Sequence, residues 1–157
     1  MSLQLVIEEK GAEQASQLLV GLARRGEDPR PAFKTILDEL RMAEDVWFRS
    51  HGKGDWPALA PETLARKREL GQPSDILVAT GALGRSLTVR RGAKSVRSAT
   101  KTRMRFGSQV WYGKFHKLGS GNSPVRDPLL PLDLRTRRRM VKDVQDYMMG
   151  RLRRTSV

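Results

Sequence analysis

Two glycines and two hydroxyl residues lie close together at residues 80–86, in the order Thr-Gly-Ala-Leu-Gly-Arg-Ser. Glycine-rich turns can cradle a phosphate with their backbone N–H groups. A P-loop needs Gly-x-x-x-x-Gly-Lys followed by Ser or Thr, and a dinucleotide fingerprint needs three glycines that open a long helix. This segment has neither pattern. It predicts instead a turn without phosphate affinity, in which Thr80 caps one helical turn, Gly81 relieves crowding and Leu83 enters the core.

Two histidines, His51 and His116, are the candidates for acid–base or metal chemistry. Neither lies near a nucleophile motif, and the sequence contains no cysteine. A metal site would have to join His51 and Asp55 to distant ligands, because no paired-histidine helix or acidic calcium loop is present. We therefore predict a protein that is not an enzyme, with no catalytic residues, no cofactor and no metal.

Basic residues give a sharper signal. The formal net charge of +13 favours nucleic acid, anionic lipid or an acidic protein surface as a partner. Four arginines cluster where a helix is expected to begin and where its dipole disfavours cations; they are Arg135, Arg137, Arg138 and Arg139. An acidic partner or DNA phosphates would explain the cluster, and a solvated basic face is the alternative. A second basic group, Lys101, Arg103 and Arg105, could add non-specific DNA contacts.

The length of 157 residues fits one domain, which we place at residues 1–152, followed by a frayed basic tail at residues 153–157. The hydrophobic share of 38% is low for a monomer of this size, so a partner is expected to cover part of the surface. No signal peptide or membrane-spanning run is visible, and we expect synthesis in the cytoplasm without a membrane partner.

Hydrophobic periodicity predicts the elements of the first half. Alternation predicts a strand at residues 3–7, and apolar positions at helical spacing predict a helix at residues 12–25. A second helix begins near Pro29 and Pro31 and runs to about Ser50. Residues 52–61 then form an ordered loop pinned by Trp56, and a short helix follows at residues 62–70.

The second half predicts an antiparallel meander of three strands, at residues 86–91, 95–100 and 102–113, the first of them starting at Ser86. A helical turn at residues 112–118 and a mobile glycine- and serine-rich loop at residues 119–124 follow. Asp133 caps a last helix, whose inward stripe is Met140, Val141, Val144, Met148 and Leu152. Aromatic residues, Trp111 among them, are expected to anchor the core, with base stacking as the alternative.

The predicted fold class is α+β, with N-terminal amphipathic helices and a C-terminal helix packed on a small antiparallel sheet. Four motifs follow one another between Gly54 and about Val144; they are GKGDWPALAPETLARKRELG, ILVATGALGRSL, FGSQVWYGKFHKLG and SPVRDPLLPLD. In this order they resemble the phage virion morphogenesis family, which includes tail-completion proteins of contractile-tailed phages and of phage Mu. The Thr-Gly-x-Leu-x-x-Ser turn also resembles head-to-tail joining proteins of long flexible-tailed phages, so both groups stay open.

The resemblance implies a structural protein that acts where a finished tail meets a filled head. It assigns structural roles to the motif residues Trp56, Thr80, Gly81, Leu83, Ser86, Tyr112, His116, Gly119, Pro124 and Arg126. It also implies a homo-oligomeric ring that contacts a tail terminator, tail tube or neck connector protein, in the virion and earlier in the host cytoplasm. A basic protein that binds DNA phosphates through the arginine cluster is the alternative function.

Overall fold

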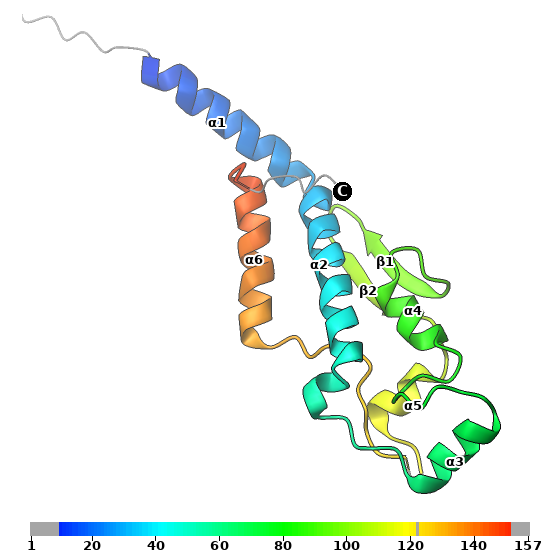
Figure 1. Ribbon diagram of the computed structural model, residues 1–157. Coiled ribbons are helices and arrows are strands. Elements are labelled where there is room, and N and C mark those ends of the chain that lie inside the picture. Colours follow the sequence, from blue (N-terminus) through cyan, green and yellow to red (C-terminus); the bar gives the residue numbers. More distant parts are fainter. Residues whose placement is uncertain (1–9, 122, 152–157) are drawn as a thin grey trace, which may run out of the picture.

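Helices form most of the described chain, and a two-stranded antiparallel sheet completes an α+β fold, which confirms the predicted class (Figure 1). The computed structural model describes residues 10–121 and 123–151. The strand predicted at residues 3–7, Leu152 and the tail at residues 153–157 lie outside this part. In chain order the elements are α1 (Lys10–Glu27), α2 (Arg30–Arg49), the 3-10 turn η1 (Gly52–Gly54), α3 (Pro61–Glu69), α4 (Ala82–Thr88), β1 (Ser95–Ala99), β2 (Met104–Ser108), α5 (Gly113–Leu118) and α6 (Leu134–Met148).

Helix α2 lies at the centre of the fold and forms the main wall of the core. Its start follows from Pro29 and Pro31, because proline fits a first helical turn and Phe33 N donates to the Pro29 carbonyl at 3.1 Å. It ends before His51, whose φ of +49° leaves the helical region. The sheet and α4 contact α2 on one side, and α6 contacts it on the other (Figure 1).

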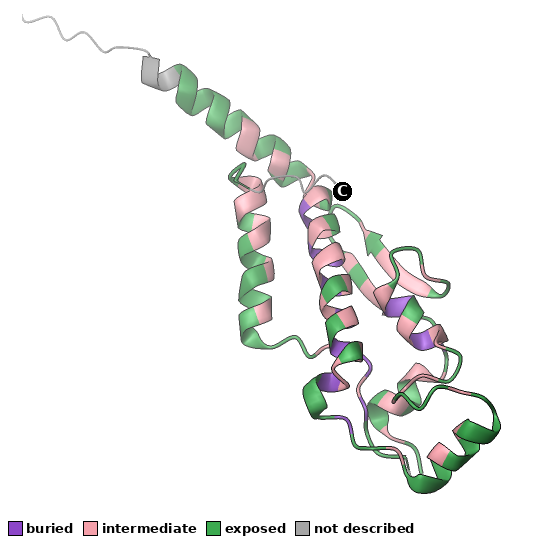
Figure 2. Cartoon of the chain, in the orientation of Figure 1, coloured by how far each residue is buried: buried purple, intermediate pink, exposed green. Residues whose placement is uncertain are grey.

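Helix α1 projects away from this body and touches it near its last turn (Figure 1). There Arg25 Nε donates to the Met148 carbonyl of α6 at 2.6 Å, and the Tyr147 hydroxyl donates to the Asp28 carbonyl at 3.0 Å. Residues 13–20 of α1 are exposed, apolar ones included (Figure 2). The predicted helix is therefore present, but most of its surface remains uncovered.

Helix α6 begins as predicted, because the Asp133 carboxylate accepts from Thr136 N at 2.7 Å and so satisfies a free N–H of the first turn. Its inward stripe is partly wrong. Met140, Val144 and Met148 are half-buried, whereas Val141 is 57% exposed. The reason is that α6 rests on α2 and α1 along one side, and no described element covers the side that carries Val141.

The sheet has two strands in the described chain, not the three predicted. β1 and β2 pair antiparallel, with Ser95 opposite Ser108 and Ala99 opposite Met104. The strand predicted to start at Ser86 is wrong, because residues 82–88 form helix α4. The spacing of the buried leucines suits a helix, because Leu83 and Leu87 are four residues apart and both are buried on the same face of α4.

The core is small and lies between α2, α4 and the end of β2 (Figure 2). The α2 stripe contributes five buried apolar side chains, Ala32, Ile36, Leu37, Leu40 and Trp47. A second cluster joins the α4 leucines to Val110, with Phe48, Phe106, Tyr112 and Leu129 packed around it. Fifteen large apolar side chains are exposed in the described chain, so much apolar surface is left for a partner.

Candidate functional site

Two tryptophan side chains meet on one backbone carbonyl. The Trp47 and Trp56 indoles donate to the Asp127 carbonyl oxygen at 3.2 and 3.1 Å. The two rings are buried and pack edge to face, with centroids 6.2 Å apart. Gly52 permits this approach, because its φ of +67° suits glycine and a Cβ there would lie 2.6 Å from the Trp56 ring. The pair ties α2 and the following loop to the segment that precedes α6.

Arg126 joins the loop after α2 to the segment before α6 through buried hydrogen bonds, and this contact is here called the junction. Its side chain is 8% exposed and donates from Nε to the Pro57 carbonyl at 2.8 Å and from Nη2 to the Ala58 carbonyl at 2.7 Å. Burial lowers the pKa of this guanidinium from its ordinary value. Arg126 N also donates to the His116 carbonyl at 2.8 Å. Arg126 thus clamps the loop after Trp56 to the end of α5.

His116 lies beside this clamp and is suited to a neutral, structural role. Burial, and secondly the charge of Arg126, lowers the pKa of His116, so the imidazole is uncharged near neutral pH. Its ring packs edge to face on Tyr112 at 6.1 Å between centroids. Together with Pro124 these residues wall a cavity of about 440 Å³ that also contains Lys67. Lys67 Nζ is held there by three backbone carbonyls, including that of Val78 at 2.6 Å.

Glu44 is a buried carboxylate that the sequence prediction missed. It is 2% exposed on α2, and Oε1 accepts from Leu130 N at 2.9 Å. Oε2 has no hydrogen-bond partner among the described residues. Burial, and to a smaller extent the Asp127 charge, raises the pKa of Glu44 to about 7. A signal was present in the sequence, since Leu40, Glu44 and Trp47 share one helical face.

The turn at residues 80–86 leads into α4 and links it to β2. Gly81, with a φ of +74°, is the N-cap of α4, while the Thr80 hydroxyl accepts from Ala82 N at 3.4 Å. Leu83 is buried, as the sequence predicts. The buried Ser86 hydroxyl lies 2.6 Å from both the Leu83 carbonyl oxygen and the Ser108 hydroxyl, so it links α4 to β2.

The remaining motif residues lie at the two ends of α5 and in the loop that follows it. Tyr112 is half-buried at the N-cap of α5, and Gly119 follows the helix with a φ of +75°. Ser120 and Ser123 form an antiparallel bridge across the loop, in which Ser123 N donates to the Ser120 carbonyl at 2.9 Å. The predicted mobility of this loop stays a prediction, and Asn122 lies outside the described residues.

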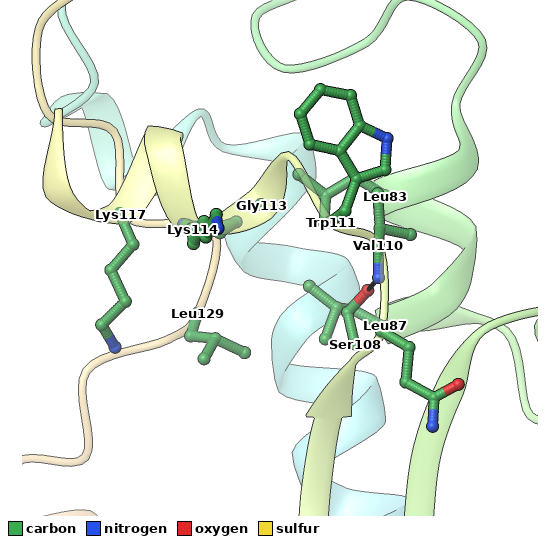
Figure 3. Close-up of a pocket in the computed structure, with 11 residues that line it drawn as sticks. Leu83, Leu87, Ser108, Val110, Trp111, Gly113, Lys114, Lys117 and Leu129 are labelled. Atoms are coloured by element: carbon green, nitrogen blue, oxygen red, sulfur yellow. Dashed lines mark hydrogen bonds between the residues drawn. The ribbon is translucent and has the colours of Figure 1, made fainter. Parts of the chain in front are cut away.

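An apolar hollow of about 310 Å³ opens beside α5 (Figure 3). Its floor contains the buried Leu83, Leu87 and Val110, and α5 contributes Lys114 and Lys117 to its wall. Trp111 at the rim is 68% exposed, which contradicts the prediction that it anchors the core. The chain turns directly after Val110, so Val110 enters the core and the next side chain faces outward.

The structure separates the two basic groups. Arg135, Arg137, Arg138 and Arg139 are exposed at the start of α6, whereas Lys101, Arg103 and Arg105 lie at the turn between β1 and β2 and along β2. Helix α2 stands between them (Figure 1). Arg137 Nε donates to the Leu132 carbonyl at 2.9 Å, and Arg139 lies 3.5 Å from Glu39. Arg135 and Arg138 have no such partner among the described residues, so they are the arginines available to another molecule.

The described residues contain no group of three or more histidine, cysteine, aspartate or glutamate side chains that could hold a metal ion. His51 and Asp55 are not joined by further ligands; instead His51 Nε2 lies 3.8 Å from Asp75. No helix within residues 10–121 and 123–151 combines the length and apolar character needed to cross a membrane.

The geometry defines a small basic α+β protein in which the motif residues Trp56, His116 and Arg126 are linked by hydrogen bonds to the segments around Asp127 and Pro57. The chain belongs to the phage virion morphogenesis family, whose model matches residues 11–149. It is therefore a phage protein with a structural or assembly role in the virion. The chain has no significant match among curated proteins or among solved structures.

Proposed function

We propose that this chain is a non-enzymatic assembly protein of the neck or tail end, which completes the tail and joins it to the head. Family membership supports the general role in building the virion. One observation carries the finer proposal: the motif side chains are engaged within the molecule, while apolar side chains at both ends remain exposed. Exposed apolar patches of this kind mark protein–protein contacts.

The contacts that we propose are of two kinds. Copies of the chain pack side by side in a ring, and the ring meets a tail terminator, tail tube or neck connector protein. The net charge of +13 would attract an acidic neighbour during assembly in the host cytoplasm. The loop at residues 119–124 is a further contact candidate, because Ser120, Gly121 and Ser123 are exposed beside α5.

Electron microscopy of a phage lysate tests this function directly. A phage that lacks this gene should yield filled heads and separate tails, with few joined particles. A plasmid copy of the wild-type gene should restore joined particles and the infectious titre. Normal infectious particles from the deletion phage would contradict the proposal, and so would heads that fail to fill with DNA.

Contact with DNA is the second candidate function, favoured by the unpaired Arg135 and Arg138 at the start of α6. Cations at this position do not stabilise the helix, since its dipole is positive there. If these residues bind phosphates, affinity for duplex DNA should fall steeply as salt increases. Alanine at Arg137, Arg138 and Arg139 should then weaken binding for every DNA sequence. Unchanged affinity would exclude this candidate.

A further inference from the structure

The cavity of about 440 Å³ beside His116 is lined by segments that are far apart in the sequence. They lie within residues 58–67, 77–79, 112–116 and 123–126, so each of the four sequence motifs contributes one segment. Helices α3 and α5, which supply part of the lining, lie at the same end of the molecule (Figure 1). Packing in the core explains the motif residues Trp56 and Leu83. It does not explain the polar side chains that line this cavity.

Arg126 is a buried cation without a carboxylate partner among the described residues. Its side chain is 8% exposed and lines the cavity. The next residue, Asp127, is engaged elsewhere, since its carboxylate lies 3.5 Å from Lys117 Nζ. Buried charges are normally paired, because taking an ion out of water is costly. The two backbone carbonyls that Arg126 contacts carry only partial charges, so an anion from another molecule would complete the pairing.

The guanidinium also keeps free hydrogen-bond donors. Its Nε and Nη2 each donate to a carbonyl, whereas Nη1 has no partner within the described part of the chain. The hydroxyl of Tyr112, which lines the same cavity, has no such partner either. In residues 10–121 and 123–151, no side-chain atom that is sealed from solvent without a partner belongs to this cavity. Both groups are therefore open to a ligand.

The lining is positively charged and otherwise largely apolar. The described residues that form it include Lys67 as a second cation and no aspartate or glutamate. Lys67 Nζ donates to three backbone carbonyls, so it contributes charge but no free donor. Leu59, Leu77 and Val78 are half-buried in the wall. A single open guanidinium nitrogen beside apolar walls suits a monoanion with an apolar group, whereas a phosphate dianion would need more donors.

We propose that this cavity binds a carboxylate that is carried on a small apolar group. The carboxylate accepts from Arg126 Nη1 and from the Tyr112 hydroxyl, and the apolar group packs against Leu77 and Val78. The volume lies in the range of pockets that take small ligands. A peptide chain end, an acidic side chain and a free organic acid share this chemistry, and the experiment below distinguishes them. The site is independent of the proposed assembly function.

The two histidines of the chain provide the readout, because His116 lines the cavity and His51 does not. NMR spectra of the imidazole C–H groups are recorded while wild-type protein is titrated with N-acetyl-leucine, and a His51→Gln variant assigns the two signals. The His116 signal should shift and saturate with a dissociation constant on the order of 1 mM, while the His51 signal stays in place. Burial and the Arg126 charge lower the pKa of His116, so a bound carboxylate should raise that pKa.

Three further ligands identify the source of the carboxylate. N-acetyl-leucinamide carries the same apolar group without the charge and should shift neither signal. N-acetylisoglutamine offers only a side-chain carboxylate, and isovalerate is a free acid. Tightest binding of N-acetyl-leucine would assign the site to a peptide chain end. Tightest binding of N-acetylisoglutamine would assign it to an acidic side chain, and of isovalerate to a free organic acid.

Variants then locate the binding groups. Tyr112→Phe removes only a hydroxyl and should weaken binding severalfold. Arg126→Gln should weaken it by about tenfold or more, because it removes the charge and the donor. Lys114→Gln is the matched control and should bind normally, since Lys114 lies on α5 but lines the other hollow. Circular dichroism shows whether Arg126→Gln still folds; if it does not, Tyr112→Phe and the wild-type titration decide.

Four results would overturn the inference. The first is the absence of a saturable His116 shift with all three carboxylates. The second is an equal shift with N-acetyl-leucinamide, which shows that binding needs no charge. The third is equal weakening by Lys114→Gln and Tyr112→Phe, which indicates general attraction to a basic chain. The fourth is tighter binding of inorganic phosphate than of N-acetyl-leucine.

Discussion

The junction around Asp127, formed by Trp47, Trp56 and Arg126, is buried, whereas residues 13–20 of helix α1, here called the arm, are exposed. At the junction, two indoles and a buried guanidinium all donate to backbone carbonyls, so each of these donors has a partner. On the arm, Leu18 and Leu19 are 63% and 66% exposed. We therefore expect the buried motif residues to maintain the fold, and we expect the contacts of the proposed assembly function to use exposed side chains.

This contrast separates two kinds of residue that a family motif does not distinguish. Trp56 and Arg126 are motif residues, yet their side chains face the interior. Trp111 lies next to the motif residue Tyr112 and faces solvent. We therefore expect substitutions at the junction to change stability first, and substitutions on the arm or the hollow rim to change assembly while stability is kept.

The two tryptophans give the clearest test of the contrast. Trp56→Ala should lower the free energy of unfolding by about 3–5 kcal/mol, because it removes a buried ring and leaves a cavity. Trp111→Ala should lower it by less than about 1 kcal/mol, since that ring is mostly exposed. Urea unfolding followed by circular dichroism measures both values. Equal losses for the two variants would contradict the contrast.

Glu44 should make the junction sensitive to pH. Its pKa is raised from 4.5 to about 7 in the folded chain, so the folded state binds a proton more tightly than the unfolded state. The stability that this group contributes is complete below about pH 4.5 and is lost as the pH rises through 7, a change of about 3 kcal/mol. The difference in stability between wild type and Glu44→Gln should follow this curve. Glu39→Gln on the same helix is the control, and a difference that does not vary with pH would refute the assignment.

A smaller effect is expected at the turn before α4. Gly81→Val should destabilise the fold by about 2 kcal/mol, because the φ of +74° suits glycine and strains a β-branched residue. Gly84→Ala, three residues later, should be neutral or stabilising, because Gly84 lies inside α4 and a Cβ there would meet Phe48 at an ordinary 3.6 Å. Thermal unfolding of both variants measures the difference. A Gly81→Val variant that melts at the wild-type temperature would show that this position does not need glycine.

The smallest effect on stability is expected in the arginine cluster. Arg138→Ala should change the free energy of unfolding by less than about 0.5 kcal/mol, since the side chain is exposed without a partner among the described residues. Arg137→Ala removes a hydrogen bond to the Leu132 carbonyl and should cost slightly more. If DNA is the partner, Arg138→Ala should reduce the slope of log affinity against log salt by about 1. An unchanged slope would assign the cluster to another role.

Several elements could be predicted from the sequence because a local signal marks them. Proline at the start of α2 and Asp133 before α6 identify those helix ends. The apolar stripe from Phe33 to Trp47 predicts the face of α2 that buries Ile36, Leu37, Leu40 and Trp47. The sequence predicts a strand from Ser86, which lies inside α4, because a short apolar segment with alternating residues fits both periods. Its true conformation depends on the fit of Leu83 and Leu87 against the core, which is a tertiary effect.

The junction could be predicted only in part. The resemblance marks Trp56 and Arg126, but the acceptors of their hydrogen bonds are backbone carbonyls far away in the sequence, and no side-chain pattern reveals them. Glu44 has the same difficulty, since its burial follows from how residues 126–130 cross α2. The exposure of Trp111 and of the arm could not be read from periodicity, which predicts an apolar face but not what covers it.

The most direct test of the proposed assembly function is complementation of the deletion phage with a chain that carries both Leu18→Asp and Leu19→Asp. Purified protein should first show wild-type unfolding in urea, because both side chains are exposed and away from the junction. This stable variant should yield filled heads and separate tails, while a Leu70→Asp control on the exposed end of α3 should yield joined, infectious particles. Infectious particles at the wild-type titre from the arm variant would contradict a role of these exposed side chains in assembly.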